Sequence, residues 1–286
     1  MSDVGVIHDI GYQRYDGPRL GRRYVFGSLF AHGFRTAFGL GRGAKSKIFP
    51  WFVTGVVIVV AVVLMAIRAQ TGTVVLTYLQ FPQTLGLLIV LFCAVAAPEL
   101  VSRDLQSGVL PLYFSRPLRP SDYGLAKLAA LVAAITAIFA AGEVIMFLGA
   151  AFTVKGFGNI FDEFQDMLGG VAYSAVHALV FGSIAILVAS LMKRRAVAAG
   201  ALVAIFVLTT PVFGVLAVLP STTANQLSGL VSPGTLVGGV GDWVFQEQSG
   251  AVDIGPYGPL YLAVAVALVV GCTGLLLARY RKVAKA

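Results

Sequence analysis

The chain has 286 residues, of which 58% are hydrophobic and 12% charged, and its mean hydropathy is +0.87. About a quarter of the residues in a soluble globular domain are charged, so this composition excludes an ordinary soluble protein and indicates an integral membrane protein. The formal net charge of +8 is interpreted as basic loops beside anionic lipid, and no nucleic-acid partner is expected.

Residues 1–49 are predicted to form a cytoplasmic segment that ends in an amphipathic helix. The beginning of this segment lacks hydrophobic periodicity and is expected to be irregular. Between residues 20 and 40 apolar side chains recur at helical spacing, which is typical of a helix lying in the membrane interface. Alternatively, the same stripe packs against the protein's own spans. The stripe consists of Phe26, Leu29, Phe30, Phe34, Ala37 and Phe38.

Residues 39–46 nearly match the phosphate-binding pattern GxxxxGK[ST], but Ala44 stands where the second glycine belongs. That pattern binds phosphates when a strand precedes the loop and a helix follows it. Here an amphipathic helix precedes the segment and an apolar stretch follows. No nucleotide-binding site is therefore predicted at residues 39–46.

Six apolar stretches follow, each near or above the length that a membrane-spanning helix needs. They predict an all-α polytopic membrane protein with six transmembrane helices, preceded by the interfacial helix. The transmembrane domain is expected over residues 50–280, and residues 281–286 form a tail. The stretches are residues 50–67, 81–100, 125–152, 167–192, 196–219 and 257–278.

The charges that separate these stretches indicate the orientation of the chain. With the amino terminus in the cytoplasm, 19 of the 21 Lys and Arg residues lie on cytoplasmic segments, and the exceptions are Arg68 and Lys155. The positive-inside rule then favours a multi-pass protein of the cell (plasma) membrane with both termini cytoplasmic. The expected outer loops hold acidic residues: Asp162, Glu163, Asp166, Asp242, Glu247 and Asp253.

The inner loop, residues 98–123, is longer than a connector requires. Pro98 and Glu99 suit the start of a short helix, and Gly108 suits its end. After the loop, Ser121 is expected to cap the third span, with Asp122 in its first turn. The loop is interpreted as a short helix, a turn and a re-entry into the membrane, and as a docking surface for another protein.

The residues of this loop resemble those of the permease subunits of ABC-2 type exporters. The resemblance consists of an acid at the end of the second span, a basic–acidic pair, a glycine, a leucine-rich patch, Ser-x-Pro, and an aromatic residue and a lysine entering the third span. In that family the acids and the basic residue form a continuous Glu-Arg-Glu run, whereas here they are separated as Glu99, Arg103 and Asp104. The matching residues are Glu99, Arg103, Asp104, Gly108, Leu110, Leu112, Ser115, Pro117, Tyr123 and Lys127.

The resemblance implies that the loop is a coupling helix seated in a groove of a separate ATPase subunit. ATP and Mg²⁺ would then bind to that partner, and this chain would hold no cofactor and no catalytic site. A second permease subunit, identical or paralogous, would complete the pathway across the lipid bilayer. The docking residues expected from the resemblance are Glu99, Arg103, Asp104, Leu105 and Gly108.

Glu143 and His177 are the titratable residues deepest in the apolar stretches. An ionisable side chain inside the membrane is costly, so each is a candidate functional residue. Both are predicted to face the protein interior, where antiparallel third and fourth spans could join them as a hydrogen-bonded pair. They could line a substrate path, or they could form a structural contact that fixes two helices.

The expected outer loop, residues 220–256, could contain short helices or be a plain loop. For the whole chain, the first hypothesis is the permease of an ATP-driven exporter. An ion-gradient-driven secondary transporter that uses Glu143 and His177 is the alternative, although the two halves show no internal repeat. A membrane-embedded enzyme or scaffold is a third hypothesis, disfavoured because the sequence contains no catalytic constellation.

Overall fold

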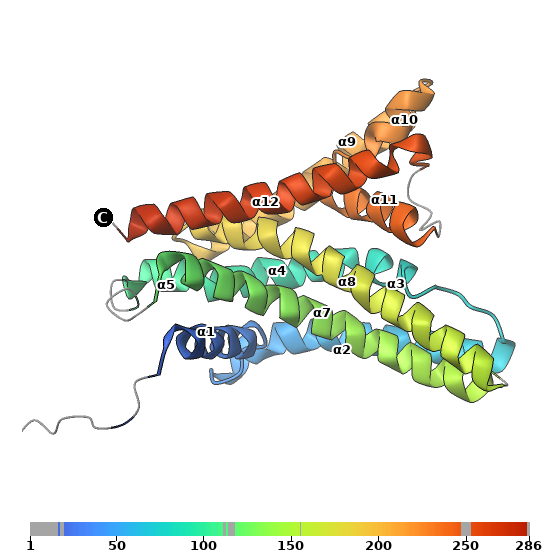
Figure 1. Cartoon of the computed structure of the whole chain (residues 1–286), viewed down its shortest axis with the longest axis horizontal. Helices are drawn as coiled ribbons and strands as arrows, with labels where there is room; N and C mark the ends of the chain where they lie inside the picture. Colours follow the sequence, from blue (N-terminus) through green and yellow to red (C-terminus); the bar gives the residue numbers. More distant parts are fainter. Residues whose placement is uncertain are drawn as a thin grey trace, which may run out of the picture.

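The computed structural model describes residues 17, 20–110, 113, 118–154, 156–246 and 253–284. These residues form helices, with no strand among them (Figure 1). The helices are α1 (Arg22–Ala37), α2 (Ala44–Thr71), α3 (Gln80–Thr84), α4 (Gly86–Leu100), α5 (Ser102–Gln106), α7 (Pro120–Thr153), α8 (Phe157–Leu191), α9 (Arg195–Ala217), α10 (Thr222–Ser228), α11 (Pro233–Phe245), the 3₁₀ helix η1 (Gly255–Tyr257) and α12 (Gly258–Val283).

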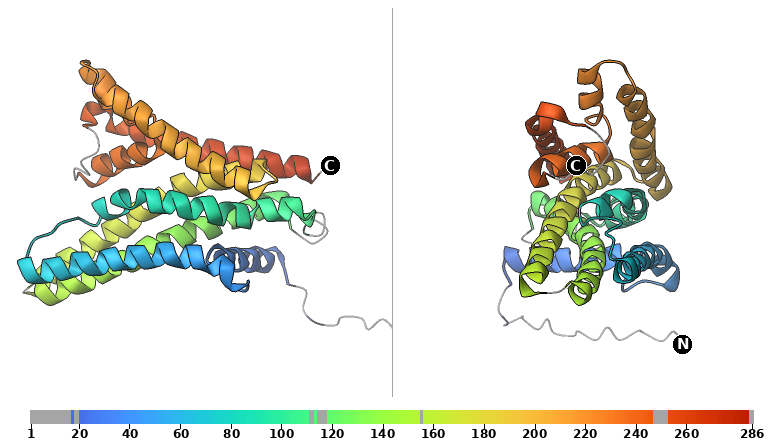
Figure 2. Two further views of the ribbon diagram at one scale, coloured as in Figure 1. Left: turned by 180° about the vertical axis from the view of Figure 1, so that it is seen from behind. Right: turned by 90° about the vertical axis from the view of Figure 1, so that its right-hand side faces the viewer.

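Within the described residues, six helical segments are long and apolar enough to cross a membrane, which confirms the predicted fold class. They are α2, α4 with α5, α7, α8, α9, and η1 with α12. Helix α8 is the most buried of the six, whereas α9 and α12 are the least buried. Figures 1 and 2 show α9 and α12 diverging from the rest of the bundle toward α10.

The predicted starts of the second and fourth spans are wrong. The second span does not begin at Phe81, because the chain breaks at Leu85 between the short helix α3 and α4. The fourth span begins at Phe157 rather than at residue 167. Asp162 and Glu163 therefore lie in the first two turns of α8 and not in a loop. Hydropathy did not indicate these turns of α8, because charged residues lower the mean hydropathy of a segment. A membrane-spanning helix can nevertheless continue through charged turns beyond the apolar layer.

Helix α1 packs against the bundle through the stripe that the sequence indicates. Leu29 and Ala37 are buried, and Phe38 contacts Phe92 of α4 with ring centroids 6.0 Å apart. Gly33 allows a close approach, because a Cβ atom there would lie 2.8 Å from the Cβ of Ala130. The right-hand view of Figure 2 shows α1 lying across the bundle. The stripe thus contacts the protein's own spans, which was the alternative interpretation.

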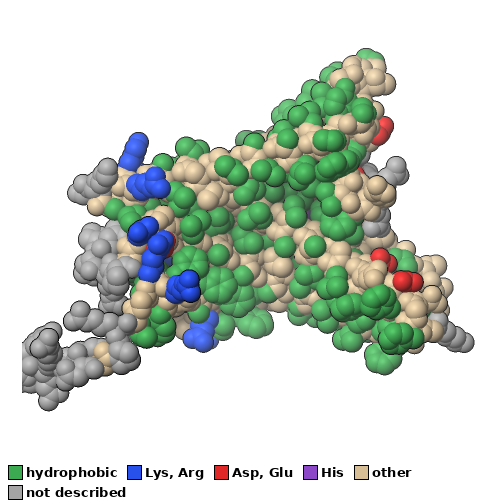
Figure 3. Space-filling view, in the orientation of Figure 1, with side chains coloured by type: hydrophobic (Ala, Val, Ile, Leu, Met, Phe, Trp, Pro, Cys, Tyr) green, Lys and Arg blue, Asp and Glu red, His purple; other side chains and the backbone are tan. Residues whose placement is uncertain are grey.

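Charged residues gather at opposite ends of the bundle (Figure 3). The end that holds α1, α5 and the end of α12 is called the basic end (Figure 1), and these elements carry Arg22, Arg103 and Arg281. The opposite end, with Asp162 and the other acids of α8, is called the acidic end. This separation is the one that the sequence predicts, and the cytoplasmic position of the basic end stays a prediction.

The segment 220–256 contains short helices at the acidic end. Helices α10 and α11 both lie within it, and α11 packs against α12 and α8. Tyr261 of α12 is fully buried there, and its hydroxyl donates to the carbonyl of Gln226 over 2.7 Å. The close packing needs Gly239, since a Cβ atom at that position would lie 2.3 Å from the Tyr261 ring.

Candidate functional site

The short helix α5 is joined to α4 by a sharp break at the basic end. Helix α4 ends at Leu100, Val101 leaves the helical conformation, and α5 begins at Ser102. The hydroxyl of Ser102 donates to the carbonyl of Ala189 over 2.8 Å, so the start of α5 is fixed to the end of α8. Gly108 follows with a φ of +66°, which confirms it as the stop of this helix.

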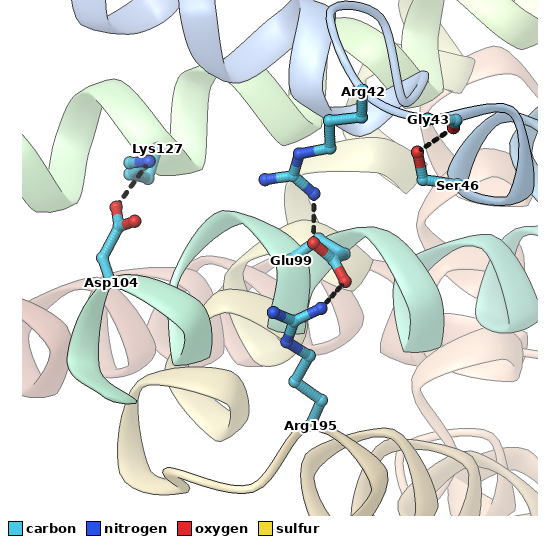
Figure 4. Close-up of polar contacts among 7 residues, drawn as sticks. All are labelled: Arg42, Gly43, Ser46, Glu99, Asp104, Lys127 and Arg195. Carbon is cyan, nitrogen blue, oxygen red and sulfur yellow. Dashed lines mark hydrogen bonds and ion pairs between the residues drawn. The ribbon is translucent and has the colours of Figure 1, made fainter. Parts of the chain in front are cut away.

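Glu99 in the last turn of α4 holds two arginines from distant parts of the chain (Figure 4). Its carboxylate pairs with Arg42, which lies between α1 and α2, and with Arg195 at the start of α9. Arg42 and Glu99 are each about one-fifth exposed. Glu99 lies inside α4 and Pro98 is buried there, so the predicted start of a new helix at Pro98 is wrong. The acid instead links three segments at the basic end.

Asp104 of α5 forms a second cluster with α7 (Figure 4). Its Oδ2 atom lies 3.0 Å from Nζ of Lys127 and accepts a hydrogen bond of 2.7 Å from the Tyr123 hydroxyl. The Lys127 ammonium also lies 5.3 Å from the centroid of the Tyr123 ring. Tyr123 in turn packs edge-on against Tyr280 near the end of α12, at 4.9 Å between centroids. Asp104 therefore ties α5 to the centre of the bundle.

Asp122 in the first turn of α7 anchors α1. Both of its oxygens accept from the Arg22 guanidinium at 2.5 Å, and it also accepts from the backbone N–H of Arg119. The hydrogen bond that Arg22 donates to Asp122 raises the pKa of Arg22. The position of Asp122 confirms the prediction, but Ser121 is not the cap, because the helix already begins at Pro120 with Arg119 as its N-cap.

The five predicted docking residues divide into two groups. Arg103 and Gly108 are exposed on the surface of the basic end. Leu105 is half-buried against the core, and Glu99 and Asp104 are engaged in the ion pairs described above. Of the other residues that carry the resemblance, Leu110 is buried, whereas Leu112, Ser115 and Pro117 lie outside the described residues.

The structure brings Glu143 and His177 into the interior but does not join them. Glu143 is fully buried, and its Oε1 atom accepts a 2.6 Å hydrogen bond from Ser174, one turn before His177. Neither ring nitrogen of His177 has a hydrogen-bond partner among the described residues. The predicted interior position is confirmed, and the predicted hydrogen-bonded pair is wrong.

Sequence reasoning missed a polar cluster at the acidic end. Arg68 at the end of α2 forms a bidentate pair with Glu163 of α8, and the Tyr78 hydroxyl donates to the same carboxylate over 3.1 Å. Burial raises the pKa of Tyr78, and the charge of Glu163 raises it further. Arg68 could have indicated this cluster in the sequence, because a basic residue at the predicted outer end of a span is expected to pair with a nearby acid.

Within the described ranges, no three His, Cys, Asp or Glu side chains come together as metal ligands. The arrangement at the basic end consists instead of ion pairs that connect α5 to α7, and α4 to α9 and to the segment between α1 and α2. It can transmit a displacement of α5 to several spans at once.

Six apolar helices among the described residues define this chain as a multi-pass membrane protein. A family model described as "ABC-2 family transporter protein" matches residues 58–248, and the chain belongs to that family. Membership implies that the chain is the permease component of an ABC transporter and that it associates with ABC ATPase subunits. No curated protein matches the chain.

Proposed function

We propose that this permease belongs to an ATP-driven exporter and that its ATPase subunit docks on α5. The family match carries the proposal, because a transporter of this kind needs a surface through which a separate ATPase acts on the membrane helices. The proposed contact surface consists of the exposed residues Arg103 and Gln106 of α5 and of Gly108 just after this helix. ATP and Mg²⁺ would bind to the partner, and the basic end would face the cytoplasm.

The bonds at the basic end support a coupling role for α5. A force on the exposed side of α5 would reach α7 through Asp104 and Lys127, and α8 through Ser102. It would reach α9 through Glu99 and Arg195. Because these contacts are short and partly buried, α5 would move as one body with the ends of the spans, as in a rigid-body transition. Glu99 and Asp104 would thus transmit the motion, while Arg103 would contact the partner.

A second permease subunit would complete the pathway. The least buried spans, α9 and α12, carry large exposed apolar side chains such as Val207, Leu208, Val270 and Leu275. In a membrane these faces contact either lipid or another subunit. The subunit composition of the purified complex distinguishes an identical second subunit from a paralogous one.

Purification of the tagged chain from its native membrane tests the proposed function. The expected complex contains an ATPase subunit and hydrolyses ATP, and the hydrolysis falls when Arg103 is replaced by glutamate. Arg281→Glu is the matched control, because it makes the same charge change on the basic end but on α12. Export in the absence of any ATPase, driven by a proton gradient, would contradict the proposal and favour the secondary transporter.

The secondary-transporter hypothesis relied on Glu143 and His177 as joint coupling groups. Glu143 is bonded to Ser174, whereas His177 is surrounded by aromatic rings, with Phe181 at 4.2 Å and Phe139 at 5.8 Å between centroids. This geometry is typical of a helix contact and an aromatic cluster. We therefore favour the ATP-driven exporter over the secondary transporter.

A further inference from the structure

The acidic half of the bundle contains a cavity of about 280 Å³ between α4, α8, α9 and the start of α11. It is far larger than the roughly 30 Å³ that one water molecule occupies in the liquid. None of the described residues that line it carries a formal charge. Most of the wall is apolar and comes from three spans: Leu87, Val90, Phe181, Phe206, Val207 and Phe213.

His177 is a buried polar side chain of this wall without a hydrogen-bond partner. It is 1% exposed, and neither of its ring nitrogens finds a hydrogen-bond partner in the described parts of the chain. A buried polar group without a partner costs free energy, and such groups are rare in folded proteins. An uncharged imidazole offers one N–H donor and one acceptor nitrogen. The wall of the cavity therefore contains a buried, directional hydrogen-bonding group that has no partner among the described residues.

With the exception of Ser232, the other polar side chains of the wall are already bonded to the protein. The side-chain amide of Gln83 accepts from the Tyr173 hydroxyl over 2.9 Å and donates to the carbonyl of Gly234 over 3.0 Å. The hydroxyl of Thr210 donates to the carbonyl of Phe206. An ordered water beside His177 would thus meet few of the two to four partners that a buried water needs. A molecule with an apolar body satisfies the site better.

We propose that this cavity binds a neutral, largely apolar molecule through a single hydroxyl group that hydrogen-bonds to His177. The aromatic and aliphatic wall would hold the body of the ligand, and the imidazole would fix its polar end. An ion is disfavoured, because none of the described lining residues carries a charge and the His177 imidazole is itself buried. The inference concerns binding by this chain alone and holds whether or not α5 docks an ATPase.

The histidines allow a direct test. The chain contains three of them, so the full-length protein in lipid nanodiscs, labelled with ¹⁵N in the histidine rings, gives a small set of signals. The signal of His177 is assigned by its loss in His177→Gln. Titration with 2-naphthol is expected to shift the ring-nitrogen signals of His177 saturably, and to leave those of His32 on α1 unchanged. Naphthalene, which lacks the hydroxyl, is expected to bind about tenfold more weakly.

Two substitutions block the site in different ways. Thr210→Leu places extra volume in the cavity and is expected to abolish the shift. Its matched control is Thr209→Leu on the same helix, which also removes a hydroxyl bonded to the helix backbone but does not line the cavity. Gly86→Ala serves if the first variant misfolds. Its new Cβ atom would lie 3.7 Å from Nε2 of His177, an ordinary contact that shields the nitrogen.

The proposal is overturned if 2-naphthol leaves the His177 signals of the folded protein unchanged, or if naphthalene binds equally well. A shift that persists undiminished in both Thr210→Leu and Gly86→Ala would also overturn it, since the probe would then act from the surrounding lipid.

Discussion

The Nζ atom of Lys127 in α7 lies 3.0 Å from the carboxylate of Asp104 in α5, and the lysine side chain is only 3% exposed. A buried ammonium requires a compensating charge, and here the charge comes from the helix that we propose as the docking surface. The contact therefore has two consequences, one for stability and one for coupling.

Replacing Asp104 by asparagine is expected to destabilise the protein by about 3 kcal/mol, because it leaves the Lys127 ammonium buried without a counter-charge. The measurement is the free energy of unfolding of the purified chain in detergent. The double variant Asp104→Asn with Lys127→Met is expected to recover most of the loss, since it removes both charges. Strictly additive losses would show that the two side chains are energetically independent.

Glu99→Gln and Arg103→Glu are expected to impair the transporter at different steps. Glu99→Gln removes the ion pairs to Arg42 and Arg195, so the ATPase should stay bound while transport per ATP hydrolysed declines. Arg103→Glu reverses a charge on the exposed side of α5, so retention of the ATPase should decline. The measurements are the amount of co-purified ATPase and the coupling ratio in vesicles. Equal loss of ATPase in both variants would contradict this separation.

His32 on α1 makes folding stability depend on acidity. Partial burial lowers the pKa of His32 below its ordinary value of 6.5, and the charges of Lys127 and Arg42 lower it further, against the opposing effect of Asp104. The unfolded chain therefore binds a proton at a higher pH than the folded chain. The contribution of His32 to stability is complete above pH 6.5, falls as the pH falls through that value, and becomes constant below the folded-state pKa.

Unfolding temperatures measured between about pH 7.5 and 5.5 test this effect. The decline in acid is expected to be smaller in His32→Gln than in the wild type. Arg35→Gln on the same helix is the control, because arginine does not titrate in this range. An identical slope for His32→Gln and wild type would show that the imidazole makes no contribution.

At the acidic end, Arg68→Gln is expected to cost about 2 kcal/mol of unfolding free energy, between the values for exposed and fully buried pairs. Arg68 and Glu163 are each less than one-fifth exposed, so the remaining carboxylate would lose a nearly buried partner. Substitution of Glu163 by glutamine as well should recover part of the loss. A change below about 0.5 kcal/mol would indicate that the pair is screened by solvent.

Several features of the fold could be predicted from local chemistry. Each apolar stretch is long enough to identify a span by itself. Gly108 could be predicted as a helix stop because only a residue without a Cβ adopts its positive φ easily. Asp122 could be placed in the first turn of α7 because an acid there complements the helix dipole.

Other features depend on which segments meet in space. The partners of Glu99 lie 57 and 96 residues away along the chain, and no local pattern specifies them. The sequence did not predict the charged first turns of α8 as helical, because hydropathy does not show that Arg68 of α2 pairs with Glu163. The pairing of Glu143 with Ser174 rather than His177 reflects the rotation of α8 about its axis, which helix depth alone does not determine.

Site-directed photo-crosslinking from α5 tests the central claim most directly. A photoreactive amino acid replaces Gln106, which is exposed on α5, and in a separate protein it replaces Leu219, which is exposed near the acidic end. Illumination of native membranes is expected to link the Gln106 position, and not the Leu219 position, to a subunit that binds and hydrolyses ATP. The claim would be contradicted if the Gln106 position gave no link to such a subunit in a membrane where the complex is intact.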